Sequence, residues 1–219
     1  MELLRQVLDR IDEVDPQAVL MVGDLACAGN GRTRRASSIQ QYREDLAMVL
    51  AAVRQRGRPF AFVPGNHDLR DLPEPENVDG RGTTLAGLRV SGIGGAGPDI
   101  FGFAYEWQED EIRRLRLPAA DVLLCHAPPR ETSLDRTHHG WHVGSTAIRE
   151  RASAMRGVLL CGHIHESAGA AMLNDCLCMN VGALGRPFGR PCLGFVQDLD
   201  HLWHEDLGTG RVQEWRRGG

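Results

Sequence analysis

The sequence predicts an α/β protein in which helices alternate with short strands of mixed sheets. The chain starts with an amphipathic helical pattern over residues 1–14 and continues into an uninterrupted apolar run over residues 18–22. The same alternation recurs as far as residue 161, and short strand patterns dominate from residue 169 onward. Uninterrupted apolar runs of this length are typical of strands that are buried on both faces.

Apolar side chains recur at helical spacing in the first predicted helix, at positions 3, 4, 7, 8 and 11. A second helix carries apolar residues at 46, 49, 50 and 53 and ends near Gly57. Two more helices are predicted over residues 109–115 and 145–156, the latter with Ser145 as its N-cap. The predicted strands are residues 18–22, 60–63, 88–93, 121–125, 158–161, 170–173, 177–181, 194–198 and 201–206. Residues 71–82 are predicted to form a surface loop.

Length and composition describe an ordinary globular protein. The 219 residues fit a single domain over residues 1–219, with 42% hydrophobic and 25% charged residues. A net charge of −4 provides no basic surface for a membrane and argues against long nucleic acids as partners. No apolar run reaches the length of a membrane span, and the first residues do not resemble a signal peptide, so we expect a cytoplasmic protein.

Polar clusters follow four of the apolar runs, each at the point where the predicted strand ends. The clusters are Gly23-Asp24, Gly65-Asn66-His67-Asp68, His126, and Gly162-His163-Ile164-His165. Ligands of open α/β sheets bind beyond the carboxyl ends of the strands, so we expect these clusters to converge on one site.

The residue types in these clusters are those of hydrolytic metal chemistry. Imidazole and carboxylate groups suit zinc, iron and manganese, and an asparagine oxygen suits harder ions. Two ions about 3.5–4 Å apart can generate hydroxide and clamp phosphoryl oxygens. Gly23, Gly65 and Gly162 are expected to let the backbone turn so that the next side chain points into the site. A Gly-Asp pair alone is usually a turn and a lone histidine is usually structural, so the prediction depends on the combination.

In their order along the chain, the four motifs resemble those of the calcineurin-like metallophosphoesterase superfamily. The resemblance spans nearly the whole chain and implies a four-layer α/β/β/α sandwich of two mixed sheets flanked by helices. It also implies hydrolysis of a phosphodiester or phosphomonoester by metal-activated water at a dinuclear site. Two divalent ions, drawn from manganese, iron, zinc, cobalt and nickel, are the cofactors of that family.

The resemblance assigns a role to each polar residue. The implied metal ligands are Asp24, which bridges both ions, Asn66, His126 and His163 at the second ion, and His165 at the first. His67 is expected near the leaving oxygen as a general acid or charge stabiliser, with Asp68 orienting it. A histidine performs this role efficiently when its pKa is close to the working pH.

A histidine-rich segment over residues 137–145 opens the fourth predicted helix and resembles a segment in a small bacterial and archaeal branch of the superfamily. Because a helix N-terminus can receive an anion, Ser145 is a candidate substrate-binding residue, and His142 could face the same pocket. The alternative is a loop with solvated histidines and a capping serine.

One motif of the superfamily is absent. No Asp-x-His precedes Gly23-Asp24, so the first ion would keep only Asp24 and His165, and we expect this chain to hold one ion or fewer. Three hypotheses follow: a misplaced or trimmed start, a natural one-metal enzyme, or a non-catalytic member that binds a phosphorylated ligand or a protein partner.

We favour the first hypothesis because His67 and Asp68, whose use lies in chemistry, are both kept. It predicts that the in-frame sequence upstream of Met1 encodes an apolar strand that ends in Asp-x-His. The expected substrate is a small phosphorylated molecule, with no membrane partner. The identities of the substrate and the metal, and the oligomeric state, stay open.

Overall fold

The computed structural model describes residues 2–28, 36–185 and 191–218, so Met1 of the first predicted helix lies outside the described residues. The helices are α1 (Glu2–Val14), α2 (Ala36–Arg54), α3 (Glu109–Arg114) and α4 (Thr146–Ser153), with a 3-10 turn η1 (His165–Ser167). The strands are β1 (Val19–Met21), β2 (Phe60–Phe62), β3 (Gly82–Leu85), β4 (Leu88–Ile93), β5 (Val122–Cys125), β6 (Gly157–Cys161), β7 (Gly169–Leu173), β8 (Cys176–Asn180), β9 (Cys192–Asp198), β10 (His201–Asp206) and β11 (Arg211–Arg216).

A six-stranded mixed sheet runs through the centre of the molecule, with the order β3-β4-β5-β6-β8-β7. Its four inner strands are parallel, and β3 and β7 add antiparallel edges. Residues 122–125 and 157–161 are buried throughout, as expected for parallel strands that are covered on both faces. The carboxyl ends of β5 and β6 therefore lie side by side at one edge of the sheet.

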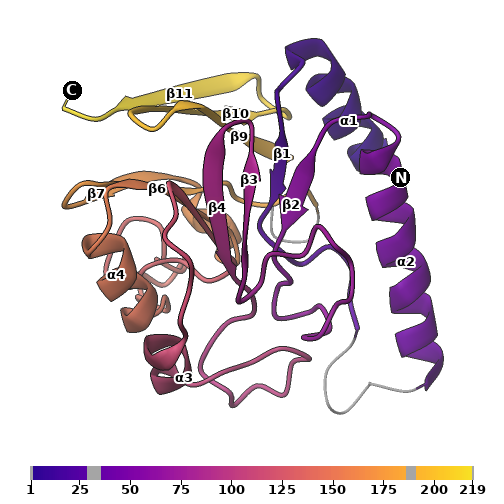
Figure 1. Cartoon of the computed structure of the whole chain (residues 1–219), viewed down its shortest axis with the longest axis horizontal. Coiled ribbons are helices and arrows are strands. Elements are labelled where there is room, and N and C mark those ends of the chain that lie inside the picture. The colour runs from indigo at the N-terminus through magenta and orange to yellow at the C-terminus, as the bar shows by residue number, and fades with distance from the viewer. Residues whose placement is uncertain (1, 29–35, 186–190, 219) are drawn as a thin grey trace.

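Two smaller sheets pack against the six-stranded sheet. Strands β1 and β2 form a parallel pair, and β9, β10 and β11 form an antiparallel sheet. Figure 1 shows α1 and α2 along the β1–β2 pair and α3 and α4 on the opposite side of the molecule. Arg10 of α1 makes a bidentate ion pair with Glu205 of β10, at 2.8 and 2.7 Å, and so ties the first helix to the three-stranded sheet.

Three apolar cores separate these layers. The first lies between α3, α4 and the six-stranded sheet, and the second lies between α1, α2 and the β1–β2 pair. The third fills the space between the six-stranded sheet and the two smaller sheets, and includes Leu124, Met179 and Leu202. Helices, small sheets, large sheet and helices thus follow one another, which confirms the predicted α/β sandwich; the second sheet, however, is divided in two.

Some local expectations differ from the structure. Residues 19–21 are only half-buried, although the apolar run predicted a strand buried on both faces. Residues 82–85 form β3, where a loop was predicted up to residue 82, and residues 211–216 form β11 without an apolar run. Both missed strands are exposed edges held by hairpin pairing, to β4 and β10 respectively, so their side chains carry little hydrophobic pattern.

None of the six cysteines forms a disulfide within the described residues, and Cys125, Cys161, Cys176 and Cys178 are buried in the first core, where thiols pack as small apolar groups. Across the described ranges, no helix is long and apolar enough to cross a membrane.

Candidate metal centre

The four polar clusters meet where β1, β2, β5 and β6 end. The amide of His67 donates to Asp24 Oδ1 at 3.0 Å, which joins the loops after β1 and β2. The ring of His126 contacts Asn66 and Asp24, and its centroid lies 5.0 Å from that of His163. The predicted convergence of the strand ends is confirmed.

Three acceptor atoms point toward one another at the middle of this cluster. His126 Nδ1–H donates to the carbonyl of Val22 at 2.7 Å, so in the neutral ring the lone pair is on Nε2. That nitrogen lies 3.0 Å from Asn66 Oδ1 and 3.5 Å from Asp24 Oδ2. The contact with Asn66 is a hydrogen bond when Nε2 carries a proton or when the amide is turned so that its NH2 group donates, and the same three groups are also suited to a cation. A backbone carbonyl that fixes one ring nitrogen is also the usual arrangement around a histidine that binds metal.

The charge state of the surrounding groups favours metal binding. Burial, reinforced by the neighbouring His126, lowers the pKa of His163 to about 3, so its ring is neutral and keeps a lone pair at neutral pH. Burial also lowers the pKa of His165, the residue that begins η1. For Asp24, burial raises the pKa, but His126, the His67 amide and His163 together outweigh it, and the net shift is downward.

Asp24, Asn66, His126 and His163 are therefore the candidate ligands of one cation. Among the residues that the structure describes, no group of three or more His, Cys, Asp and Glu side chains is close enough to hold an ion. As placed here, Asp24, His126 and His163 thus do not close around an ion, and binding would have to draw them together. The first predicted ion is left with Asp24 and His165, and two ligands do not make a tight site.

Two of the six described non-glycine residues with a positive φ lie in this centre. Asp24 and His163 have φ values of +53° and +67°, in the left-handed region that residues other than glycine rarely occupy. Gly162, which we expected to make the turn before His163, has an ordinary φ, and the turn is made by His163 itself. Such strain persists where the surrounding structure holds the residue in place, and it often marks functional sites.

Gly65 is required by a close approach rather than by its φ. A Cβ atom at this position would lie 2.1 Å from Asp24 Oδ1 and 2.3 Å from its amide nitrogen. Gly23 combines a φ of +98° with a similar approach, since its Cβ would lie 2.6 Å from His126 Nδ1. The two loops can thus pack backbone to backbone only because both positions lack a side chain.

The carboxylate of Asp68 binds backbone amides rather than the His67 ring that it was expected to orient. It accepts from Gly65 N at 2.7 Å, Leu25 N at 3.1 Å and Ala26 N at 3.0 Å. The side chain is fully buried, and burial raises its pKa although the three amides act in the opposite direction. Asp68 therefore joins the loop after β1 to the loop after β2.

His67 contacts two side chains that the sequence patterns did not single out. Cys27 Sγ lies 3.7 Å from His67 Nδ1, and the Phe103 ring lies 4.5 Å from the His67 ring, centroid to centroid, at an interplanar angle of 59°. Cys27 follows the Gly-Asp motif but belongs to no recognisable spacing. Phe103 lies in a segment rich in glycine and aromatic residues, and that enrichment is the one sequence signal that could have indicated it.

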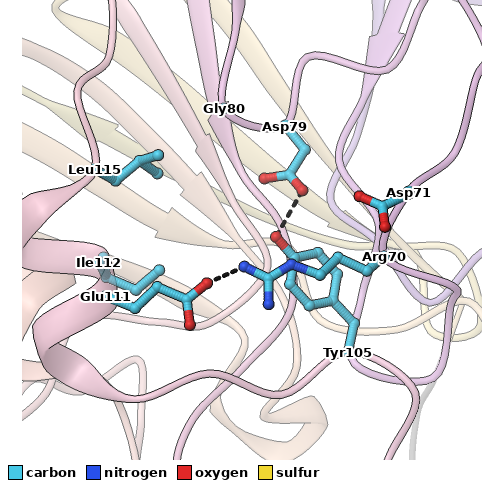
Figure 2. A pocket seen from close by; sticks show the side chains of 8 residues that line it. All are labelled: Arg70, Asp71, Asp79, Gly80, Tyr105, Glu111, Ile112 and Leu115. Carbon is cyan, nitrogen blue, oxygen red and sulfur yellow. Dashed lines mark hydrogen bonds and ion pairs between the residues drawn. The ribbon is translucent and has the colours of Figure 1, made fainter.

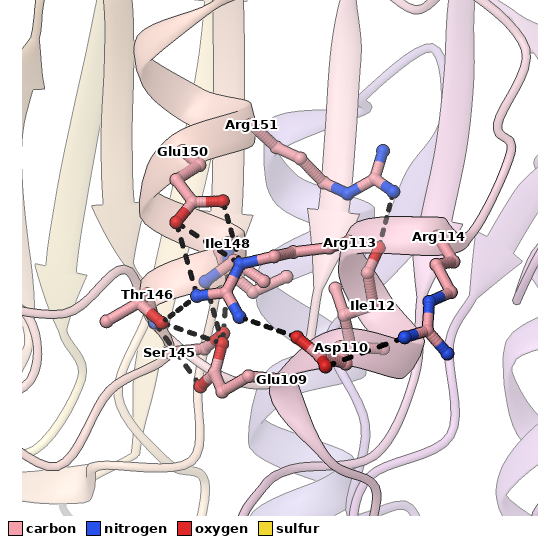
Figure 3. Close-up of polar contacts among 11 residues, drawn as sticks. Glu109, Asp110, Ile112, Arg113, Arg114, Ser145, Thr146, Ile148, Glu150 and Arg151 are labelled. Atoms are coloured by element: carbon pink, nitrogen blue, oxygen red, sulfur yellow. Dashed lines mark hydrogen bonds and ion pairs between the residues drawn. The ribbon is translucent and has the colours of Figure 1, made fainter.

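Ser145 and His142 occupy a different network. Ser145 Oγ accepts from Ile148 N at 3.1 Å, which confirms the predicted N-cap of α4, and it donates to the Glu109 carboxylate at 2.9 Å. Figure 3 shows that the same carboxylate reaches Thr146 and covers the start of α4. The anion at this helix N-terminus is thus one of the chain's own carboxylates.

His142 Nδ1 pairs with the fully buried Asp135 at 2.7 Å, and the carboxylate also accepts from the amides of Glu131, Thr132 and Gly144. This network fixes the orientation of the His142 ring. Substrate binding by His142 and Ser145 stays a prediction.

A separate pocket lies beside the loop that follows β2 (Figure 2). Its polar groups pair with one another: Arg70 stacks on the Tyr105 ring at 4.9 Å and pairs with Glu111, and the Tyr105 hydroxyl donates to Asp79 at 2.6 Å. The backbone amide of Tyr105 donates to the carbonyl of Asn66 at 3.1 Å. The residues that line the pocket thus support the loop that carries Asn66 and His67.

The sequence profile of the calcineurin-like phosphoesterases matches residues 1–167 of the chain. The chain belongs to the calcineurin-like phosphoesterase family, as its motifs indicated. This is a family of hydrolases, and its activity is metal-dependent hydrolysis of phosphoesters. A search of curated proteins found no match.

Two solved structures share the fold. A crystal structure of a protein without a stated name is 16% identical with a TM-score of 0.68, covering 99% of this chain and 94% of its own. A dimetal phosphatase from Danio rerio is 11% identical with a TM-score of 0.56, covering 98% of this chain and 88% of its own. At these identities, the likeness concerns the fold.

Replacing Gly65 with alanine should disrupt the centre, because the new methyl group would collide with Asp24. We expect Gly65→Ala to weaken manganese binding by about 10–100-fold, as changes around metal ligands commonly do. Calorimetric titration would measure the affinity. Gly185→Ala is a matched control, since its Cβ would approach no atom of the described residues closer than 4.0 Å. Equal manganese affinity in both variants would contradict the geometry described.

Replacing Asp68 with asparagine should destabilise the fold. The amide group cannot accept from all three backbone N–H groups, and each buried donor left unpaired costs about 1–3 kcal/mol. Urea denaturation would measure the loss, with Asp9→Asn on the exposed side of α1 as a control of the same chemistry. A free energy of unfolding that is unchanged in Asp68→Asn would show that the three hydrogen bonds do not hold the loops.

Proposed function

We propose that this chain hydrolyses small phosphoesters at the centre formed by the ends of β1, β2, β5 and β6. The observation that supports this proposal best is the convergence of Asn66 Oδ1 and Asp24 Oδ2 on His126 Nε2, from which they lie 3.0 and 3.5 Å away. Divalent ions held by such groups lower the pKa of water and neutralise the charge of phosphoryl oxygens.

In this proposal Asp24, Asn66, His126 and His163 would hold one divalent ion, and Asp24 with His165 would contribute to a second. Manganese is our first choice, because the set combines carboxylate, amide and imidazole groups. The rigid Asp68 clamp keeps Asp24 and Asn66 in place before any ligand arrives, which reduces the reorganisation needed on binding.

His67 is the residue that we assign to the leaving oxygen. The backbone amide of His67 donates a hydrogen bond to Asp24, so the His67 ring lies at the edge of the centre, half-exposed to solvent. Since Nδ1 faces Cys27, Nε2 is the nitrogen left to donate a proton to, or stabilise, the departing oxygen. Asp68 supports this role indirectly, by holding the loop that carries His67.

A second candidate is a non-catalytic or one-metal member of the family that binds a phosphorylated ligand or a protein partner. The small number of ligands for the first ion, Asp24 and His165, favours it. The two candidates differ in turnover: the enzyme releases product, whereas the binding protein retains its phosphorylated ligand unchanged.

Turnover is the direct test. We expect the chain to release p-nitrophenol from p-nitrophenyl phosphate or bis(p-nitrophenyl) phosphate in the presence of manganese, with loss of activity on chelation. Zinc, iron, cobalt and nickel would be compared in the same assay. Absence of product with all five metals, in a protein that still binds inorganic phosphate, would reject the enzyme and favour the binding protein.

Two substitutions separate metal binding from chemistry. His163→Ala should abolish binding of the ion assigned to Asp24, Asn66, His126 and His163, because it removes a coordinating lone pair. His67→Ala should retain the ion and lower kcat by about 10²–10⁴-fold, the usual contribution of a positioned acid. Metal content by elemental analysis and kcat by steady-state assay would be measured on both variants. Equal loss of metal in the two would show that the assigned roles are wrong.

A further inference from the structure

An exposed aromatic loop borders His67. Residues 97–104 connect the glycine-rich turn after β4 to Tyr105, and they carry Ile100, Phe101 and Phe103. Ile100 and Phe101 are 70% and 65% exposed, although single exposed apolar side chains alone would need no explanation. Here the aromatic rings form a continuous row that leads to the candidate metal centre. The Phe101 ring lies 6.4 Å from the Phe103 ring, centroid to centroid, and the Phe103 ring contacts the His67 ring.

The loop is held in this shape by specific polar contacts. The carboxylate of Glu106 accepts from Phe101 N at 3.1 Å and Gly102 N at 2.9 Å, so it fixes the backbone that presents the Phe101 ring. At the base of the loop, the fully buried Trp107 donates its indole N–H to the carbonyl of Gly94 at 2.8 Å. An exposed aromatic side chain on an anchored backbone loses little further freedom on binding a ligand.

The same loop is joined to the reaction centre through the backbone. Tyr105, which follows it directly, donates its amide to Asn66, and its ring is held by Arg70 and Asp79 in the pocket of Figure 2. The distance between the aromatic rings and the candidate metal ligands is therefore set by covalent structure and hydrogen bonds.

We propose that Phe101 and Phe103 form an aromatic subsite that binds a planar, uncharged ring carried by the leaving group of the phosphoester. The inference deepens the proposed function and rests on its placement of His67 beside the leaving oxygen. Ring centroids separated by 4.5–6.4 Å, with tilted planes, are within the range of favourable aromatic pairs, and a ligand ring would extend the row His67, Phe103, Phe101. The Glu106 carboxylate is engaged by two amides, and the other carboxylate of the loop, Asp99, is exposed, so the loop offers ring faces to an uncharged ring and repels an anionic one.

Non-hydrolysable phosphonates test the subsite without requiring turnover. The full chain, supplemented with manganese, would be titrated by calorimetry with phenylphosphonate, cyclohexylphosphonate and methylphosphonate. We expect phenylphosphonate to bind about tenfold more tightly than methylphosphonate, with cyclohexylphosphonate in between, because an aromatic pair adds to simple apolar burial. A nucleoside 5′-phosphonate in the same series would show whether the preferred ring is attached directly or through a sugar.

Phe101→Ala should remove most of the preference for the phenyl group, and Phe101→Leu should remove the difference between phenyl and cyclohexyl. Phe101 is exposed, so both variants are expected to unfold at the wild-type temperature. Val212→Ala, which truncates another exposed apolar side chain on β11, should leave all affinities unchanged.

Equal affinity of the wild-type chain for the three phosphonates, or a preference that survives Phe101→Ala, would overturn the proposal. Absence of phosphonate binding would overturn the proposal as well. So would a loop that binds only another protein, because the chain would then show no preference among the phosphonates. Hydrolysis of p-nitrophenyl phosphate with no phosphonate preference would reject the subsite and keep the enzyme. A Phe101-dependent preference without hydrolysis would support the subsite and reject the enzyme.

Discussion

The buried carboxylate of Asp68 is the interaction on which the rest of the centre depends. Its two oxygens accept from the amides of Gly65, Leu25 and Ala26, and so bind the loop after β1 to the loop after β2. These loops carry Asp24 and Asn66, and they are linked further by the three-residue strand pair and by the hydrogen bond from the His67 amide to Asp24. A buried carboxylate that binds three backbone donors is a rigid, charge-assisted clamp, and the close approach that it enforces leaves no room for a side chain at Gly65.

Around this clamp, the centre gathers polar side chains on strained backbone. Polar atoms of Asp24, Asn66 and His126 face one another, and Asp24 and His163 occupy left-handed backbone conformations. Such conformations cost free energy at residues other than glycine, so the surrounding contacts must hold them in place. The low pKa of His163 keeps its imidazole neutral, which is the form that can bind a metal.

The candidate metal centre and the aromatic loop share one support. The loop after β2 receives the Tyr105 amide on the carbonyl of Asn66, and Tyr105 is itself held by Asp79 and by Arg70. Displacing this tyrosine would move both the candidate metal ligand and the exposed aromatic rings. The candidate metal centre and the aromatic loop are thus joined by one hydrogen bond between segments distant along the chain, as expected for sites built on loops that a rigid scaffold positions.

The sequence by itself determined the α/β class, the family motifs, the long helices, the buried inner strands and the identity of the polar residues that meet, because strand-end placement and apolar runs are local patterns. Only the tertiary structure decided that Asp68 binds amides rather than the His67 ring, that Ser145 is engaged by Glu109, and that Phe103 contacts His67. The exposed strands β3 and β11 were also identified only from the tertiary structure. Each of these outcomes rests on contacts between segments distant along the chain. The partner in such a contact is selected by packing and by the need to pair buried polar groups, so the local sequence pattern does not predict it.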